Sequence, residues 1–172
     1  FSYCSGLTNI IIPENVQKIG DRLFEGCSGI VKVMWNVKNC TTGGSYSYIF
    51  SGCDKFTDLE IGENVEIIPE GVFKNTKITS LIIPDSVTEI GEETFEGCRN
   101  ITSVVIGKNL KNIKKWAFEG CIRLVEIINH SDLELEKGSK DNGYIASNVI
   151  NLKTDGESGV VNNGGYLFYT YD

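Results

Sequence analysis

The chain has 172 residues, of which 41% are hydrophobic and 23% are charged, so it suits one compact domain or a short repeat array rather than a disordered segment. Its net charge of -7 argues against binding to nucleic acid, which requires a basic surface, and against electrostatic attachment to anionic lipid. No apolar run approaches the roughly 20 residues that cross a bilayer, so we expect no membrane insertion by this segment.

A four-residue motif that begins with phenylalanine recurs along the chain. The letters FEGC occur at 24–27, 95–98 and 118–121, with near-copies FSYC at 1–4, FSGC at 50–53 and FKNT at 73–76. Successive phenylalanines are 23, 26, 23, 22 and 23 residues apart. A nearly fixed period of this size is typical of a solenoid, in which stacking of the units buries a continuous core that no unit could bury alone.

Short segments in which apolar and polar residues alternate follow each four-residue motif, and they predict the strands of the solenoid. We expect strands at 9–12, 58–61, 80–83, 103–106 and 125–128, and the matching run of the second copy is IVKVMWN at 30–36. Leu81 and Ile83 lie two positions apart, so both should point into the core. A second apolar pair follows the strand in four copies: Val16 and Ile19, Val65 and Ile68, Val87 and Ile90, and Leu110 and Ile113.

The four-residue motif itself predicts a corner of the coil. Its phenylalanine should fill the far side of the core. The residue two positions later should end a short helical turn in the left-handed backbone conformation, which glycine and asparagine accept. The residues at this position are Gly26, Gly52, Asn75, Gly97 and Gly120.

The coil at residues 30–53 departs from the pattern. Its sequence at 36–49, NVKNCTTGGSYSYI, lacks the second apolar pair. The coil also has three residues more than the usual spacing of 23. We expect an irregular coil with a loop that bulges around Thr42, Gly43, Gly44 and Ser45. Insertions in solenoids map to loops that often lie on a binding surface, and the alternative is drift that the fold tolerates.

These columns resemble the BspA-like leucine-rich repeats, whose pattern is roughly L-x-x-L-x-I-P-x-x-V-x-x-I-G-x-x-A-F-x-x-C. The copy ITSLIIPDSVTEIGEETFEGC at 78–98 matches almost position for position, and the resemblance covers residues 1–128. We therefore predict a right-handed, parallel, β-rich superhelix of six leucine-rich-repeat coils with short helical turns. The family consists of bacterial and protist surface or secreted proteins, several of them similar to adhesins that bind host matrix proteins. The resemblance implies a cell-surface or extracellular location and a binding role.

Residues 129–172 form a second segment, for which we predict a C-terminal α+β cap or connector. We expect Asp141 or Asn142 to cap a short helix through Val149, and the Asn-Asn-Gly-Gly turn predicts a hairpin at 160–171. The segment also resembles the connector that follows the repeats in BspA-like proteins. Because Phe1 already lies inside a repeat, we expect the chain to be a fragment of a longer protein.

The predicted task of this segment is to cover the open end of the apolar stack, since the terminal units of a solenoid must be atypical. Leu133 and Leu135 alternate as a last strand would. The side chains that we expect to bury against the last coil are Leu133, Leu135, Ile145 and Val149.

Five of the six cysteines occupy one column of the repeat, in which Thr76 takes the place of a cysteine: Cys4, Cys27, Cys53, Cys98 and Cys121. Stacked coils hold neighbouring side chains parallel and about 5 Å apart, which is poor disulfide geometry. We therefore predict free, buried thiols rather than the disulfides that an exported protein would usually suggest. A column spaced by whole repeats does not converge on a tetrahedral site, so we expect no metal.

The single histidine, His130, lies in the run NHSD at 129–132. A Ser–His–Asp triad needs three groups that meet in space, which neighbours in sequence rarely do, so we expect a turn here rather than a catalytic site. No nucleotide-binding, metalloprotease or hydrolase motif is present in the sequence. We expect no enzyme and no cofactor.

One column of outward-facing residues is the candidate binding face. In each strand the residue between the two inward ones should face solvent, and five of the six are apolar: Ile11, Met34, Glu60, Ile82, Val105 and Ile128. A second outward row is polar and includes Lys32 and Asp58. An apolar strip with a polar rim is typical of a protein-binding surface. The alternative is that isoleucine and valine occur there because they suit strands wherever they point.

We expect a monomeric, non-enzymatic adhesion and protein-interaction module of a cell-surface or secreted protein. It would bind a protein, such as a host matrix protein, or a glycan through the sheet face of the repeats. The alternative is a structural spacer that presents other domains and has no ligand of its own. An enzyme built around His130 is a third class, which alanine at that position would test.

Overall fold

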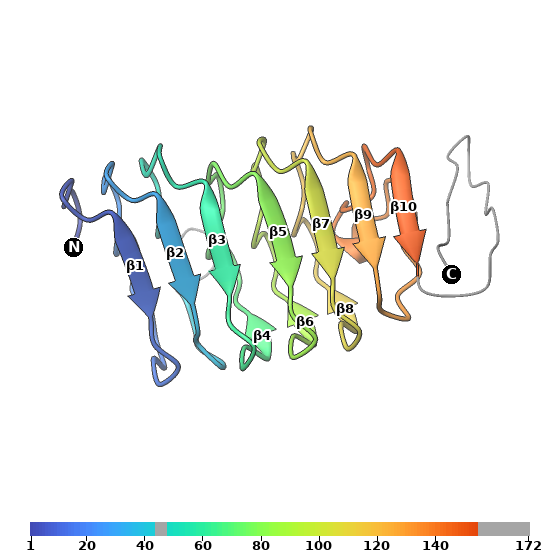
Figure 1. Cartoon of the computed structure of the whole chain (residues 1–172), viewed down its shortest axis with the longest axis horizontal. Coiled ribbons are helices and arrows are strands. Elements are labelled where there is room, and N and C mark those ends of the chain that lie inside the picture. The colour runs from blue at the N-terminus through green and yellow to red at the C-terminus, as the bar shows by residue number, and fades with distance from the viewer. Residues whose placement is uncertain (44–47, 155–172) are drawn as a thin grey trace.

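The computed structural model describes residues 1–43 and 48–154 and shows a parallel β-solenoid (Figure 1). The six predicted repeat coils are confirmed, and each contributes one four-residue strand to a long face on which the strands lie side by side. The predicted strand positions are confirmed, except that the strand expected at 125–128 lies one residue later. The strands of this face are β1 (Asn9–Ile12), β2 (Lys32–Trp35), β3 (Asp58–Ile61), β5 (Ser80–Ile83), β7 (Ser103–Ile106), β9 (Glu126–Asn129) and β10 (Asn151–Thr154).

A second, narrower sheet lies behind the carboxyl ends of the long strands. It is built from two-residue strands that each end on the second residue of the second apolar pair: β4 (Ile67–Ile68), β6 (Glu89–Ile90) and β8 (Asn112–Ile113). Every strand pair on both faces is parallel. Each coil therefore forms its backbone hydrogen bonds with the coils before and after it, as expected of a solenoid.

The column of phenylalanines forms a continuous stack through the core. Successive rings lie with their centroids 5.8, 5.3, 5.9, 5.6 and 5.1 Å apart from Phe1 to Phe118, with nearly parallel planes. The stack is fully buried at Phe73 and Phe95, whereas Phe1 is 70% exposed at the first coil. Leu81 and Ile83 are also buried, as predicted. Repetition of one apolar column thus places the same contact in every layer.

The corners are consecutive turns rather than the predicted short helical turns. The prediction of left-handed backbone two residues after each phenylalanine is confirmed, for example at Gly97 (φ 70) and Asn75 (φ 60). A second left-handed residue, which the sequence did not indicate, lies two positions before the phenylalanine, as at Glu93 (φ 54) and Trp116 (φ 58). Two such residues four positions apart interrupt α-helical hydrogen bonding, so no helix can form between them.

The second coil is irregular, as expected. It has no strand at the position of the missing apolar pair, where it pairs with the first coil only through an isolated bridge between Lys18 and Thr41. The Thr42 side chain donates a hydrogen bond to the carbonyl of Glu70 (2.8 Å) in the next coil. Residues 44–47 of the expected bulge lie outside the described part of the chain.

Residues 130–154 do not form the predicted α+β cap, because they make a further coil of the same stack. β10 pairs in parallel with β9, with Asn151 opposite Glu126. The helix expected through Val149 is reduced to the 3₁₀ turn η1 (Lys140–Asn142), and its cap is Ser139 rather than Asp141 or Asn142. Gly143 ends this turn in the left-handed conformation (φ 58).

The burial predicted for this segment is confirmed, although its secondary structure was not. Leu135, Ile145 and Val149 are buried, and Leu133 packs against the core from a half-buried position without forming the expected strand. The Phe118 backbone N–H also donates to the Gly143 carbonyl (2.8 Å), which extends the backbone ladder of the phenylalanine column. The hairpin predicted at 160–171 lies outside the described residues.

All six cysteines are free thiols, and five of them, including Cys40, are buried. In four coils the thiol donates to the carbonyl of the phenylalanine of the preceding coil, rather than facing the neighbouring sulfur. These bonds join Cys27 to Phe1 (2.9 Å), Cys53 to Phe24 (3.1 Å), Cys98 to Phe73 (3.1 Å) and Cys121 to Phe95 (3.3 Å). The column therefore ties coil to coil without a covalent bond.

Thiol titration tests this account. The unfolded chain, prepared without reductant, should show at least five reactive groups. In the folded protein at mildly alkaline pH, exposed Cys4 should react first, because burial raises the pKa of Cys53 and Cys98 to about 11 and that of Cys121 still further, which leaves little thiolate. Two or fewer reactive groups after unfolding would mean that the column is bridged.

Candidate functional site

The outward residues of the long strands form one continuous surface, here termed the strand face. The register aligns Ile11 with Met34 and Glu60, and it aligns Ile82 with Val105 and Ile128. The predicted outward column is therefore brought together by the fold. β10 adds Lys153 to its end, opposite Ile128.

The exposure of this column is uneven. Ile11 and Ile82 are 62% and 65% exposed, whereas Met34, Val105 and Ile128 are half-buried by their neighbours. The expected apolar stripe is thus broken into two strongly exposed isoleucines with the carboxylate of Glu60 between them. An isolated exposed isoleucine is ordinary, so the significance of these two depends on what lies between them.

Lys32 connects the polar row to the outward column. Its ammonium lies 2.8 Å from the Glu60 carboxylate and 3.5 Å from that of Asp58. The hydrogen bond to Glu60 is the main cause that raises the pKa of Lys32, with smaller contributions from Asp58. One cation is therefore shared by two carboxylates that are themselves about half exposed. A second pair, Lys153 with Glu126 (3.1 Å), lies at the far end of the face.

The long sheet is interrupted between β3 and β5. These strands are neighbours, yet they belong to separate hydrogen-bonded sheets. The interruption coincides with a short corner, because five steps separate Phe73 from Ile78, whereas six separate the phenylalanine from the corresponding apolar residue in the other five copies. The corner that leads into β5 is therefore one residue short.

A hollow lies on the strand face at this interruption. It has a volume of about 520 Å³, and both β3 and β5 line it. Asp58, Glu60 and Glu63 contribute carboxylates, and Ile82 contributes an apolar wall. We term it the central hollow. The sequence analysis placed Glu60, Asp58 and Ile82 on this face but did not anticipate the hollow, for which the short spacing of Phe73 and Ile78 is the only signal.

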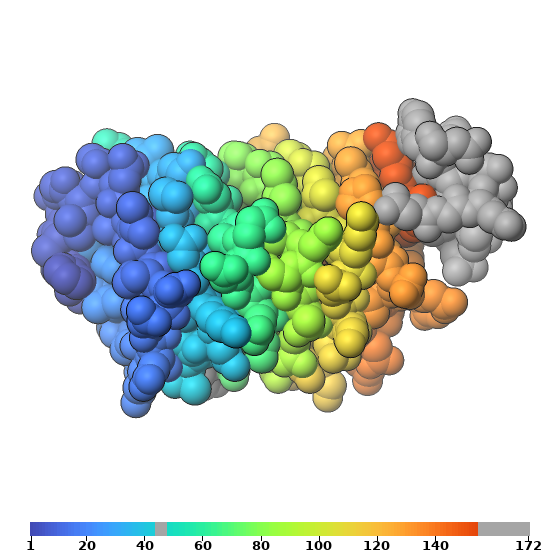
Figure 2. Space-filling view, turned by 60° about the horizontal axis from the view of Figure 1, so that its bottom comes forward, coloured from blue at the N-terminus to red at the C-terminus, as the bar shows by residue number. Residues whose placement is uncertain are grey.

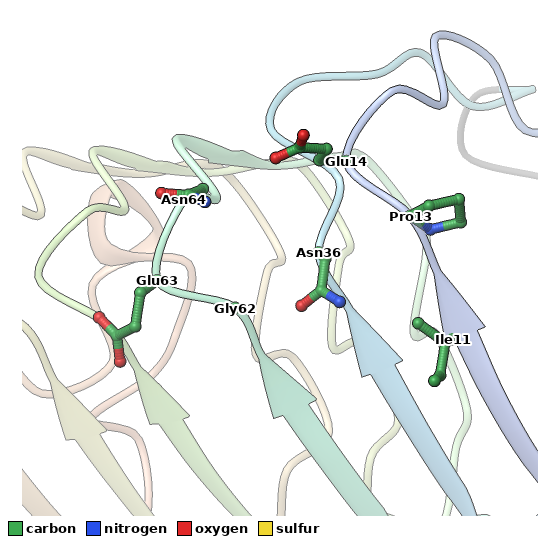
Figure 3. Close-up of a pocket in the computed structure, with 7 residues that line it drawn as sticks. All are labelled: Ile11, Pro13, Glu14, Asn36, Gly62, Glu63 and Asn64. Atoms are coloured by element: carbon green, nitrogen blue, oxygen red, sulfur yellow. The ribbon is translucent and has the colours of Figure 1, made fainter.

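A second, smaller hollow of about 300 Å³ adjoins the central one (Figure 3). It lies at the carboxyl ends of β1, β2 and β3 and shares Asn36, Gly62 and Glu63 with the central hollow. Figure 3 shows Ile11 on β1, Asn36 directly after β2 and Glu63 just beyond β3. Figure 2, which brings these strand ends forward, shows the successive coils as bands along an elongated molecule.

The structure offers no support for chemistry around His130. This residue lies half-buried in the turn after β9, where its backbone N–H donates to the Ile106 carbonyl (3.0 Å). The hydroxyl of the adjacent Ser131 donates to the amide oxygen of Asn129 (2.6 Å), so it serves the turn. Among residues 1–43 and 48–154, no group of three His, Cys, Asp or Glu side chains is arranged to hold a metal ion.

The fold and its repeat register define the class of the protein, a leucine-rich-repeat solenoid. The chain belongs to the BspA-type leucine-rich repeat family, whose model matches residues 1–77 and 46–139 in six copies. This family is defined by a repeated structural unit, and no enzyme family matches the chain. Within the described residues, no helix has the length and apolar character that crossing a membrane requires.

Two solved structures are similar to this chain. A leucine-rich repeat protein of T. pallidum (TpLRR) has a TM-score of 0.60 and 20% identity over 85% of this chain and 71% of its own, which supports the fold alone. A leucine-rich repeat protein from Bacteroides ovatus ATCC 8483 has a TM-score of 0.33 and 13% identity over 95% of this chain and 60% of its own. The comparison with curated proteins found no match.

Proposed function

We propose that this chain is a non-enzymatic binding module that engages a protein partner through the strand face, on a protein located outside the cell or at its surface. The observation that carries the proposal is the pair of exposed isoleucines, Ile11 and Ile82, on either side of carboxylates that line hollows of a rigid sheet. An apolar contact area with polar groups beside it is the usual composition of a protein interface. The location follows from the family rather than from any feature of the face.

The chemistry of the face favours a protein over a glycan as the partner. Sugar rings are commonly held by stacking on aromatic side chains, and the outward positions of the seven described long strands carry no aromatic residue. The face instead presents isoleucine, valine, methionine and paired charges. A glycan partner remains an outcome that the binding experiment can return.

A binding assay with substituted faces tests this function. Purified matrix proteins and a glycan array would be screened against the protein and against Ile82→Glu and Val105→Glu. We expect a matrix protein to bind and each substitution to weaken the affinity by about tenfold or more, because a charge placed in an apolar contact must be desolvated. Ile122→Glu is the matched control, since Ile122 is 61% exposed but lies in a corner and not on the strand face.

The spacer alternative makes the opposite prediction. An elongated stack of coils with one continuous core is also suited to holding another domain at a distance, which is what a spacer requires. If no protein or glycan binds, the hypothesis of a structural spacer is preferred. If Ile122→Glu weakens binding as much as Ile82→Glu does, the strand face is not the interface.

A further inference from the structure

The two hollows of the strand face form one groove that crosses several coils. They share Asn36, Gly62 and Glu63, so the two hollows adjoin one another along the strand face from β1 across β2 and β3 to β5; Figure 3 shows the part at β1, β2 and β3. We term this depression the transverse groove. A ligand lying in it would cross the strands rather than follow one of them.

The groove has an exposed isoleucine at each end and carboxylates between them, and a further carboxylate, that of Glu14, lines the end at Ile11. Ile11 lines one end and Ile82 the other, and both are more than half exposed. Between them lie Asp58, Glu60 and Glu63, and the only cation in contact with these carboxylates within the described residues is Lys32. Two negative charges are therefore left in excess. Glu63 forms no ion pair with any described residue.

The distance between the apolar ends corresponds to a short stretch of extended polypeptide. Ile11 is aligned with Glu60 two strand-to-strand steps away, and Ile82 lies on β5, the neighbour of β3 across the interruption, so three steps of about 4.7–4.9 Å separate their strands by roughly 14 Å. In an extended chain, residues i and i+4 lie roughly 13 Å apart, and residues i, i+2 and i+4 point to the same side. Two apolar side chains at i and i+4 would therefore reach the two isoleucines, and the side chain at i+2 would face the carboxylates.

We propose that the transverse groove binds an extended segment of the partner protein with the pattern apolar-x-basic-x-apolar, in which the two apolar side chains cover Ile11 and Ile82 and a central lysine or arginine pairs with Glu63 and Glu60. This inference rests on the proposed function and specifies its partner. A bare metal ion would leave both isoleucines uncovered, and an acidic or uncharged segment would leave the excess carboxylates without a counter-charge. A basic segment satisfies both features at once.

Two synthetic peptides of identical composition test the pattern. One carries the core Leu-Thr-Arg-Thr-Leu between Gly-Ser flanks, and the other carries Leu-Arg-Thr-Thr-Leu, in which the cation points to the opposite side. Binding to the whole chain would be measured by fluorescence anisotropy. We expect the first peptide to bind about tenfold more tightly than the second, and its affinity to fall as salt is raised, because the ion pair is exposed and screened.

Matched variants locate the peptide on the groove. Glu63→Gln should weaken binding of the first peptide by about threefold to fivefold, which is the range of an exposed ion pair. Ile82→Ser should weaken it at least as much, whereas Ile122→Ser and Glu119→Gln, at exposed corner positions, should have no effect. All four residues are at the surface, so circular dichroism should show unchanged folding and thermal melting for every variant.

Equal binding of the two peptides, binding of neither, or an unchanged affinity of Glu63→Gln would overturn the inference. Its failure is distinguishable from failure of the proposed function. If a matrix protein is bound and Ile82→Glu weakens that binding while neither peptide binds, then the strand face is an interface and the proposed segment is wrong. If no protein is bound and the peptides are not distinguished, then both proposals fail.

Discussion

Replacing Phe73 by alanine should lower the free energy of unfolding by about 3–5 kcal/mol, the range for truncating a buried aromatic side chain. The ring of Phe73 is fully buried and contacts four other rings, those of Phe50, Phe56, Phe95 and Trp35, at centroid distances of 5.9, 6.3, 5.6 and 5.3 Å. Its removal would open a cavity at the middle of the stack, where the layers on both sides hold their own positions. Urea unfolding followed by circular dichroism would measure the change.

Phe1→Ala is the matched control, because Phe1 occupies the same column but is 70% exposed and stacks on one ring only within the described residues. We expect it to cost less than about 1 kcal/mol, in proportion to the smaller burial. Equal effects at the two positions would show that the column is not the continuous core that its ring contacts indicate.

The repeat period was sufficient to predict the coils, because each strand is fixed by an apolar column rather than by local propensity. Leu81 and Ile83 lie two residues apart within a 23-residue period, and both are buried as expected. The left-handed residues after the phenylalanines were predictable because four of the five inner copies use glycine. The second left-handed position was not, since Arg22, Glu93 and Trp116 carry side chains that give no sign of positive φ.

The candidate site was predicted in part. Strand alternation placed Ile82, Glu60 and Lys32 on one face, and the parallel register aligns the coils on each side of the interruption between β3 and β5. The central hollow was missed because a pattern match passes over the one residue that is absent between Phe73 and Ile78, at the corner where the pairing of β3 with β5 is lost. The pairing of Lys32 with Glu60 was also beyond the sequence, because it depends on which neighbouring carboxylate a long side chain can reach.

The sequence predicted an α+β cap instead of a last coil because this segment lacks the four-residue motif that begins with phenylalanine. Asn151 lies 25 residues after its partner Glu126, which is close to the repeat period. The intervening sequence, however, has no F-x-x-C motif and only scattered apolar residues. Its backbone nevertheless continues the hydrogen bonds of the corner, from the Phe118 N–H to the Gly143 carbonyl, although its left-handed residues, Gly143 and Tyr144, are adjacent rather than four positions apart. The stack can therefore continue on a template of backbone hydrogen bonds after the side-chain signature has faded.

Ending the chain at Ile128 should destabilise the protein severely. The truncation would remove four large buried apolar side chains, Leu135, Ile145, Val149 and Leu152, together with smaller buried ones, and would leave β9 as the edge of the sheet. At about 1.5–3 kcal/mol for each buried side chain, and less after allowance for a compact unfolded state, the loss is on the order of 5 kcal/mol. The melting temperature should fall by about 10–20 °C, or the truncated chain should aggregate through the exposed strand edge.

Removal of residues 160–172 alone is the control for this truncation, since it leaves β10 and the buried side chains of the last described coil in place. We expect a change in melting temperature of only a few degrees, measured by scanning calorimetry with light scattering to detect association. Similar behaviour of the two truncations, or a soluble and equally stable chain ending at Ile128, would mean that residues 130–154 are a linker. The contacts of β10 with β9 and the hydrogen bond from Phe118 to Gly143 argue against that outcome, because both are formed only if this segment is part of the stack.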